Sequence, residues 1–144
     1  MAKVERSIVI NASPEVLDAI TSDGTRLTEW YVGIEKAEPD GTYPEPGGKI
    51  VNTYKAAGVS FEITQTVLER VEGKSAKNKM EGMITGVNEW IYEPEGDGIR
   101  VTTKFDYEMA GGALGKIADK LVIEKMNAEN LEKSLENLKK LAEG

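Results

Sequence analysis

Apolar and polar residues alternate along residues 3–10, and the alternation returns over most of the chain after residue 33. A repeat of two residues is typical of β-strands that bury one face. We predict strands over residues 3–10, 33–38, 49–57, 58–71, 75–84, 86–93 and 98–109. Short turns, several with glycine, connect the later strands, so consecutive strands are predicted to pair antiparallel in a meander.

Three stretches have the features of helices. Ser13 and Pro14 are residues favoured at a helix N-terminus, and a second short helix is predicted over residues 25–31. A long helix is predicted over residues 113–142 from apolar residues at three- and four-residue steps. These are Leu114, Ile117, Leu121, Ala128, Leu131, Leu135, Leu138 and Ala142. A helix of this length can cover the apolar face of the whole sheet.

Three segments carry a resemblance to a known superfamily: VERSIVINASPEVLDAI at the start, EWIYEPEGDGIRVTTKFDYEM before the long helix, and GGALGKIADKLV at its beginning. With the element order, they resemble the START-like, or SRPBCC, superfamily, in its polyketide cyclase/dehydrase and lipid-transport branch. The resemblance implies an α+β helix-grip fold. In that fold a seven-stranded curved antiparallel sheet surrounds a long C-terminal helix, and two short helices follow strand 1.

Composition excludes several kinds of chemistry. The 144 residues include no His and no Cys, which excludes Ser-His-Asp and Cys-His catalysis and zinc sites built on these ligands. Lys and Arg number 18 against 25 Asp and Glu, a net charge of -7, so no nucleic-acid partner is expected. No run approaches the roughly 20 apolar residues of a membrane span. We expect one cytoplasmic domain over residues 1–144, with no metal and no cofactor.

The predicted inward face of the sheet is unusually polar. Strand parity turns Asn52, Gln65, Asn78 and Asn88 inward, although an unpaired buried amide costs about 1–3 kcal/mol. A wet or ligand-filled cavity between the sheet and the long helix would explain these amides. Alternatively, some of them lie at strand ends or bulges and contact bulk water.

Parity and the helix stripe together give a set of candidate ligand-binding residues that we expect to line one internal space. The set consists of Trp30, Asn52, Tyr54, Phe61, Ile63, Met80, Asn88, Trp90, Tyr92, Thr103, Phe105, Tyr107, Leu114, Ile117 and Leu121. Trp30 is included because the resemblance implies that the short second helix forms the mouth of the cavity. Its alternative position is the ordinary core, where large aromatics usually lie.

Three classes of function remain, in order of preference. The first is binding or transport of a small hydrophobic or amphipathic molecule in the cavity. The second is an enzyme resembling the polyketide cyclases and dehydratases, although general acid–base groups near neutral pH are scarce without His. The third is a protein-interaction module resembling chaperone activators, with a large exposed patch in place of a cavity. Catalytic residues are not assigned, because no inward-facing carboxylate is identified; the oligomeric state is left open.

Overall fold

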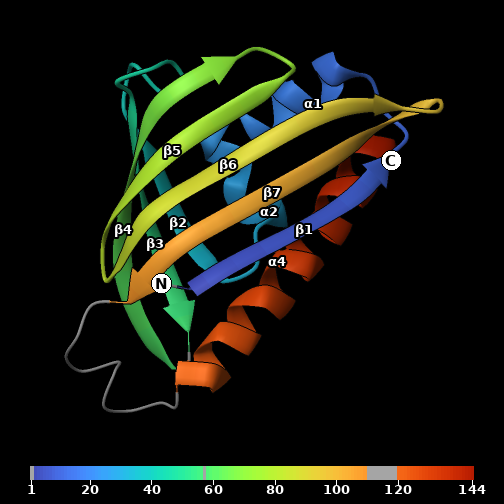
Figure 1. Ribbon diagram of the computed structural model, residues 1–144. Coiled ribbons are helices and arrows are strands. Elements are labelled where there is room, and N and C mark those ends of the chain that lie inside the picture. Colours follow the sequence, from blue (N-terminus) through green and yellow to red (C-terminus); the bar gives the residue numbers. More distant parts are fainter. Residues whose placement is uncertain (1, 57, 110–119) are drawn as a thin grey trace.

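A seven-stranded antiparallel sheet wraps around the C-terminal helix (Figure 1). The computed structural model describes residues 2–56, 58–109 and 120–144, without the side chains of Ala56 and residues 120–123. The strands are β1 (Ala2–Ile10), β2 (Ile34–Pro39), β3 (Lys49–Ala56), β4 (Val59–Val71), β5 (Ser75–Gly82), β6 (Ile84–Glu95) and β7 (Gly98–Met109). Their order in the sheet is β1-β7-β6-β5-β4-β3-β2, so the meander is closed by β1 pairing with β7. The predicted α+β helix-grip fold is confirmed.

The predicted strand register is also confirmed. On β6, Asn88 and Tyr92 are buried at 1% and 8% exposure, and Trp90 between them is half-buried. On β7, the inward residues Val101 and Thr103 are 0% exposed. Several strand boundaries differ from the prediction by one or two residues, most of all those of the fifth and sixth strands, because the sixth runs over 84–95 instead of 86–93. The corner between the fifth and sixth strands falls at residue 83, and Gly82 before it has a φ of +128°, a conformation that favours glycine.

Short helices occupy the connection from β1 to β2. Helix α1 (Pro14–Thr21) begins as predicted, with the backbone N–H of Val16 donating to Ser13 Oγ at 3.2 Å. The predicted second helix is a 3-10 turn, η1 (Gly24–Arg26), followed by one α-helical turn, α2 (Leu27–Trp30). Asp23 caps this segment by accepting from the N–H of Thr25 at 3.0 Å.

Helix α4 (Lys120–Glu143) lies inside the curve of the sheet, beside β1 (Figure 1). Of its predicted apolar stripe, Leu131 and Leu135 are 2% exposed and Leu138 is 0% exposed, whereas Ala128 and Ala142 are half-buried. The predicted helix covers residues 113–142, of which residues 113–119 lie outside the described part of the chain. Apolar burial therefore holds the C-terminal part of α4 against the sheet and the short helices.

A row of polar side chains runs along α4 next to this leucine stripe. The α4 polar row consists of Asn127, Asn130, Ser134 and Asn137. Steps of three and four residues place all four on one face of the helix. Asn127 Nδ2 donates to the hydroxyl of Tyr107 on β7 at 3.1 Å, and Asn130 Nδ2 donates to the hydroxyl of Tyr54 on β3 at 3.1 Å. The row thus connects α4 to two strands that are far apart in the sheet.

The other half of the α4 polar row binds the segment around α2. Ser134 is 0% exposed; its hydroxyl donates to the carbonyl of Asn130 at 2.7 Å and accepts from the N–H of Val32 at 2.8 Å. Asn137 Nδ2 donates to the carbonyl of Trp30 at 3.2 Å. These bonds satisfy backbone groups that follow a one-turn helix and would otherwise be buried without partners.

The end of α4 is tied to the edge strand β1. Lys139 Nζ donates to the carbonyl of Val9 at 2.9 Å, and the Glu143 carboxylate accepts from the N–H of Asn11 at 2.8 Å. Edge strands have unpaired backbone groups that can pair with other chains. Side chains of α4 therefore satisfy part of this edge.

Replacing Leu138 with Ala tests the role of the buried stripe. We expect Leu138→Ala to lower the free energy of unfolding by about 2–5 kcal/mol, because it leaves a cavity at a fully buried position. The matched control is Leu68→Ala on β4, where the side chain is 43% exposed and the expected loss is below about 1 kcal/mol. Urea denaturation measures both. Equal losses would show that α4 is not anchored through this stripe.

Candidate functional site

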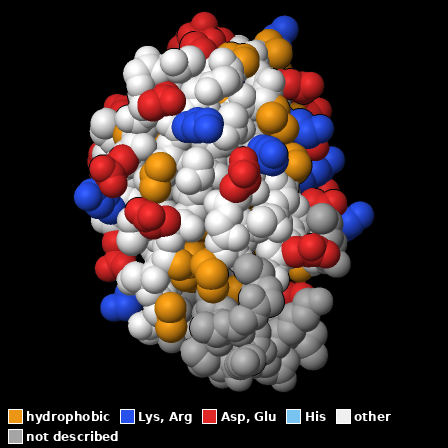
Figure 2. Space-filling model, turned by 90° about the vertical axis from the view of Figure 1, so that its left-hand side faces the viewer, with side chains coloured by type: hydrophobic (Ala, Val, Ile, Leu, Met, Phe, Trp, Pro, Cys, Tyr) orange, Lys and Arg blue, Asp and Glu red, His pale blue; other side chains and the backbone are white. Residues whose placement is uncertain are grey.

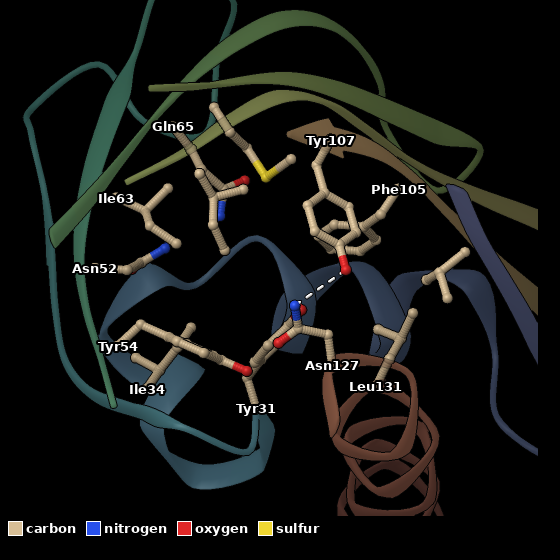
Figure 3. Close-up of a pocket in the computed structure, with 13 residues that line it drawn as sticks. Tyr31, Ile34, Asn52, Tyr54, Ile63, Gln65, Phe105, Tyr107, Asn127 and Leu131 are labelled. Atoms are coloured by element: carbon tan, nitrogen blue, oxygen red, sulfur yellow. Dashed lines mark hydrogen bonds between the residues drawn. The ribbon is translucent and has the colours of Figure 1, made fainter. Parts of the chain in front are cut away.

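Two cavities lie in the interior, each of about 60 Å³. The first, called here the tyrosine cavity, lies between the sheet and the described start of α4 and includes Tyr31, Tyr54 and Tyr107 in its wall (Figure 3). The second, the tryptophan cavity, lies nearer α1 and includes Trp30 and Trp90. Each volume corresponds to roughly four to six water molecules, at about 10–15 Å³ for each centre.

The two cavities share a wall. The residues that line both are Tyr31, Ile34, Gln65 and Phe105. Tyr31 and Ile34 also pack against both buried hydrophobic clusters, one around Trp30 and one around Tyr54. The interior therefore holds two adjacent cavities with a shared lining, where the sequence predicts one space.

Most of the predicted ligand-binding residues line one of these cavities. Those in the tyrosine cavity are Asn52, Tyr54, Ile63, Met80, Phe105 and Tyr107. Those in the tryptophan cavity are Trp30, Asn88, Trp90, Tyr92 and Phe105. Trp30 is both core and cavity wall, because it is 3% exposed and belongs to a buried cluster while it lines the second cavity.

The other predicted residues are placed differently or fall outside the description. Phe61 is buried and packs on Tyr54 with ring centroids 5.6 Å apart. Thr103 is 0% exposed, and its hydroxyl has no hydrogen-bond partner among the described residues. Neither is among the described lining residues of the two cavities. Leu114, Ile117 and the side chain of Leu121 lie outside the described part of the chain.

Asn52 presents an unpaired amide to the tyrosine cavity. Its side chain comes from β3 and is 2% exposed, and its Oδ1 atom has no hydrogen-bond partner in the described part of the chain. Figure 3 shows the amide directed toward the cavity that Ile63 and Gln65 of β4 also line. An unpaired buried amide costs about 1–3 kcal/mol. The fold therefore retains an unpaired, enclosed amide oxygen in the wall of the cavity.

The phenols around the tyrosine cavity remain protonated at neutral pH. Burial raises the pKa of Tyr31 and Tyr54 above the ordinary value, and the nearby Tyr54 and Tyr107 add to the effect on Tyr31. Burial also raises the pKa of Tyr107, and the Glu124 carboxylate adds to it. Asn130 and Asn127 donate to two of the three hydroxyls, which lowers their pKa in part. These hydroxyls can thus act as hydrogen-bond donors to a ligand.

The tryptophan cavity has a different lining. Trp30 and Trp90 meet edge to face with ring centroids 5.6 Å apart, and Trp30 Nε1 is buried without a partner among the described residues. The inward amides nearby pair with one another: Asn78 Nδ2 donates to Asn88 Oδ1 at 2.9 Å, and Asn88 Nδ2 donates to Gln65 Oε1 at 3.0 Å. Mutual pairing therefore explains three of the four amides that the sequence places on the inward face.

A buried carboxylate that the sequence analysis missed also lines the tryptophan cavity. Asp18 on α1 is 8% exposed; it pairs with Arg70 Nη2 at 2.6 Å and accepts from the N–H of Gly73 at 3.2 Å. Arg70 also pairs with Glu45 at 2.7 Å. The charges of Asp18 and Arg70 are therefore both paired and hydrogen-bonded. The network that they form connects α1, the 40–48 loop and the β4–β5 turn.

Seven described residues of the tyrosine cavity were not predicted as site residues: Val4, Tyr31, Ile34, Gln65, Ile84, Asn127 and Leu131. Tyr31 and Ile34 lie at the end of α2 and the start of β2, where strand parity gives no orientation. Asn127 and Leu131 come from α4. The sequence holds a signal for Asn127, because the asparagines and the serine of the α4 polar row repeat at the same steps as the leucines.

The surface and the described ionisable residues add little to the site. In the described part of the chain, no cluster of three or more carboxylates suits a metal ion, and no helix is long and apolar enough to span a membrane. On the face in Figure 2, acidic and basic side chains alternate, with hydrophobic atoms in small groups. The large hydrophobic side chains exposed among described residues are Val16, Leu68 and Val71.

Comparisons with known proteins agree with this architecture. The sequence profile of the family described as "Polyketide cyclase / dehydrase and lipid transport" matches residues 1–143. A search of curated proteins found no significant match.

Among the solved structures that are similar to this chain are three with different descriptions. TTHA0849 from Thermus thermophilus is 24% identical, with a TM-score of 0.80 over 96% of this chain and 95% of that chain. A START superfamily protein from Mycobacterium smegmatis is 17% identical, with a TM-score of 0.77 over 98% and 97%. The Aha1 dimer from Colwellia psychrerythraea is 15% identical, with a TM-score of 0.69 over 99% and 97%. At these identities the likeness shows the fold alone.

The five tyrosines predict a steep loss of stability in alkali. Burial raises the pKa of Tyr43 to about 12 and also raises the pKa of the other four. Folding therefore favours the protonated phenols, and the resulting stability is complete below the unfolded pKa of about 10. As the pH rises above that value, the unfolded chain loses protons first, and each phenol lowers the free energy of unfolding by about 1.4 kcal/mol per pH unit.

Urea denaturation across this pH range measures the slope, and Tyr43→Phe serves as the control because it should make the slope shallower by one phenol. Phenolate absorption should appear together with unfolding. The ordinary pKa of a phenol is about 10. Phenolate absorption near that pH, in a chain whose circular dichroism shows that it is still folded, would contradict the prediction.

Proposed function

The chain belongs to the polyketide cyclase / dehydrase and lipid transport family, and on this basis we propose that it binds a small hydrophobic or amphipathic molecule between the sheet and α4. The tyrosine cavity is the primary site. Its described wall combines aliphatic and aromatic side chains with a few amides and hydroxyls. This mixture is typical of small-molecule sites, where apolar surface supplies affinity and a few polar groups orient the ligand.

The unpaired amide of Asn52 is the observation that carries this proposal. A buried side chain without a partner lowers stability, whereas an apolar residue at the same position would not. A ligand hydroxyl or N–H that donates to Asn52 Oδ1 would remove this cost on binding, once the amide turns its enclosed oxygen toward the cavity. Retention of the amide is therefore better explained by binding than by packing.

The volume of the cavity favours a compact ligand group. About 60 Å³ of space is less than the roughly 150 Å³ of a cavity that binds benzene and far less than the volume of drug-sized ligand sites, about 300–1,000 Å³, so a single ring enters only when lining side chains shift. A longer molecule reaches the tryptophan cavity only when the wall formed by Tyr31, Ile34, Gln65 and Phe105 shifts. All four of these residues are half-buried.

Binding is favoured over turnover by the state of the phenols. Burial holds the pKa of Tyr54 and Tyr107 above the ordinary value, so both orient a ligand as donors and are weak acids for proton transfer. The described lining of the tyrosine cavity supplies no group that titrates near neutral pH.

Substitution of Asn52 with Leu separates binding from packing. We expect Asn52→Leu to raise the free energy of unfolding by about 1–3 kcal/mol, because it removes an unpaired amide. It should weaken the binding of phenol by about two- to tenfold, through the lost hydrogen bond, with little change for toluene. Calorimetric titration and urea denaturation measure these effects. Thr53→Val, one position along β3, is the control and should leave both affinities unchanged.

Loss of stability in Asn52→Leu together with unchanged phenol binding would make Asn52 an ordinary core residue. A broader test is native mass spectrometry of the protein purified from its own host. A retained small molecule supports the proposal. Failure to retain any molecule, together with no measurable binding of phenol or toluene, contradicts it.

A further inference from the structure

The tyrosine cavity holds hydroxyl donors that find no acceptor among the described residues. Tyr54 accepts a hydrogen bond from Asn130, and Tyr107 accepts one from Asn127, each at 3.1 Å. A hydroxyl that accepts an N–H still has its own hydrogen to donate. Among the described residues, none accepts a hydrogen bond from Tyr54 or Tyr107, and none is hydrogen-bonded to the hydroxyl of Tyr31.

The α4 polar row fixes this arrangement. Because an amide N–H must point at an acceptor, Asn127 and Asn130 orient the lone pairs of the two phenols toward α4. The hydroxyl hydrogens are then free to point elsewhere, and the cavity that both side chains line is the available space (Figure 3). Uncharged donors in an apolar enclosure form stronger hydrogen bonds than they do in water.

The electrostatic surroundings oppose an anion. None of the described residues that line the cavity is Lys or Arg. The carboxylate of Glu124 is close enough to Tyr107 to raise the pKa of its phenol. The chain as a whole has a net charge of -7. A carboxylate that enters the cavity loses its hydration without gaining a cation, and this transfer is costly.

We propose that the tyrosine cavity selects uncharged ligands with a hydrogen-bond acceptor, such as a carbonyl oxygen, and discriminates against carboxylates of the same shape. The acceptor lies against the hydroxyls of Tyr31, Tyr54 and Tyr107. The inference rests on the proposed function, because it specifies which ligands that same site takes. It predicts that free fatty or aromatic acids are poor ligands, while neutral ketones of equal size bind.

Three single-ring probes of similar size test the selectivity. Ethylbenzene has no acceptor, acetophenone has a neutral carbonyl, and benzoate has an anionic carboxylate near neutral pH. We expect benzoate to bind at least about tenfold more weakly than acetophenone. Calorimetric titration gives the affinities, and amide shifts in NMR spectra locate the binding in the tyrosine cavity.

The three probes also differ in how strongly water hydrates them. Comparing each variant with the wild-type protein on the same probe cancels this difference. We expect Tyr54→Phe to weaken acetophenone binding by about two- to tenfold while ethylbenzene binding changes by less than about twofold. Tyr31→Phe should do the same, and it removes no hydrogen bond between described residues, so it remains informative if Tyr54→Phe folds poorly. The matched control is Tyr43→Phe, since Tyr43 lines the tryptophan cavity and does not line the tyrosine cavity.

The outcomes separate this inference from the proposed function. Suppose that ethylbenzene binds in the tyrosine cavity. If both variants then leave acetophenone binding unchanged, or if benzoate binds as tightly as acetophenone, the selectivity is overturned and the proposed function stays intact. Equal loss in Tyr43→Phe also overturns it, because the hydroxyls of the tyrosine cavity are then not the cause. Failure of all three probes to bind contradicts the proposed function and the selectivity together.

Discussion

The burial of polar groups on α4 is the constraint on which the interior depends. In the α4 polar row Ser134 is buried and the three asparagines are half-buried, and an unpaired buried polar group costs about 1–3 kcal/mol. Partners come from three separate places: Tyr107 on β7, Tyr54 on β3, and the backbone that follows α2. Because these partners are fixed, the space between them is fixed as well, and the tyrosine cavity lies in that space.

The chain satisfies its inward polar groups unevenly. Asn78, Asn88 and Gln65 form a chain of hydrogen bonds, and Asp18 is paired with Arg70. By contrast, Asn52 Oδ1 and Trp30 Nε1 lack partners among the described residues, each in the wall of a different cavity. Unpaired groups of this kind are expected where stability is exchanged for recognition. The other two buried and unpaired atoms among the described residues, Thr103 Oγ1 and Asp106 Oδ1, belong to residues that line neither cavity, so the cavity lining as a whole, and not the unpaired groups alone, marks the interior as a site.

The sequence predicts the sheet better than it predicts the cavities. Alternation sets the inward face correctly, including the difficult strand with Asn88, Trp90 and Tyr92, because a period of two depends only on local geometry. The division into two cavities depends on Tyr31 and Phe105, whose contacts are made across the molecule. Pairing between inward amides likewise requires the strand register, which connects Asn78 directly to Asn88. Helix periodicity marks the leucines, whereas the asparagines of α4 acquire meaning only once their partners are known.

The wall between the cavities has a consequence for how such chains diverge. Of its four side chains, those of Tyr31, Ile34 and Phe105 make no hydrogen bonds with described residues. Mutations at these positions can merge, shrink or reshape the two spaces while the sheet and the attachment of α4 stay as they are. Natural selection can then change what the interior holds in single steps that cost local packing but break no hydrogen bond between described residues. A fold arranged in this way is free to acquire new ligands much faster than it acquires new architecture.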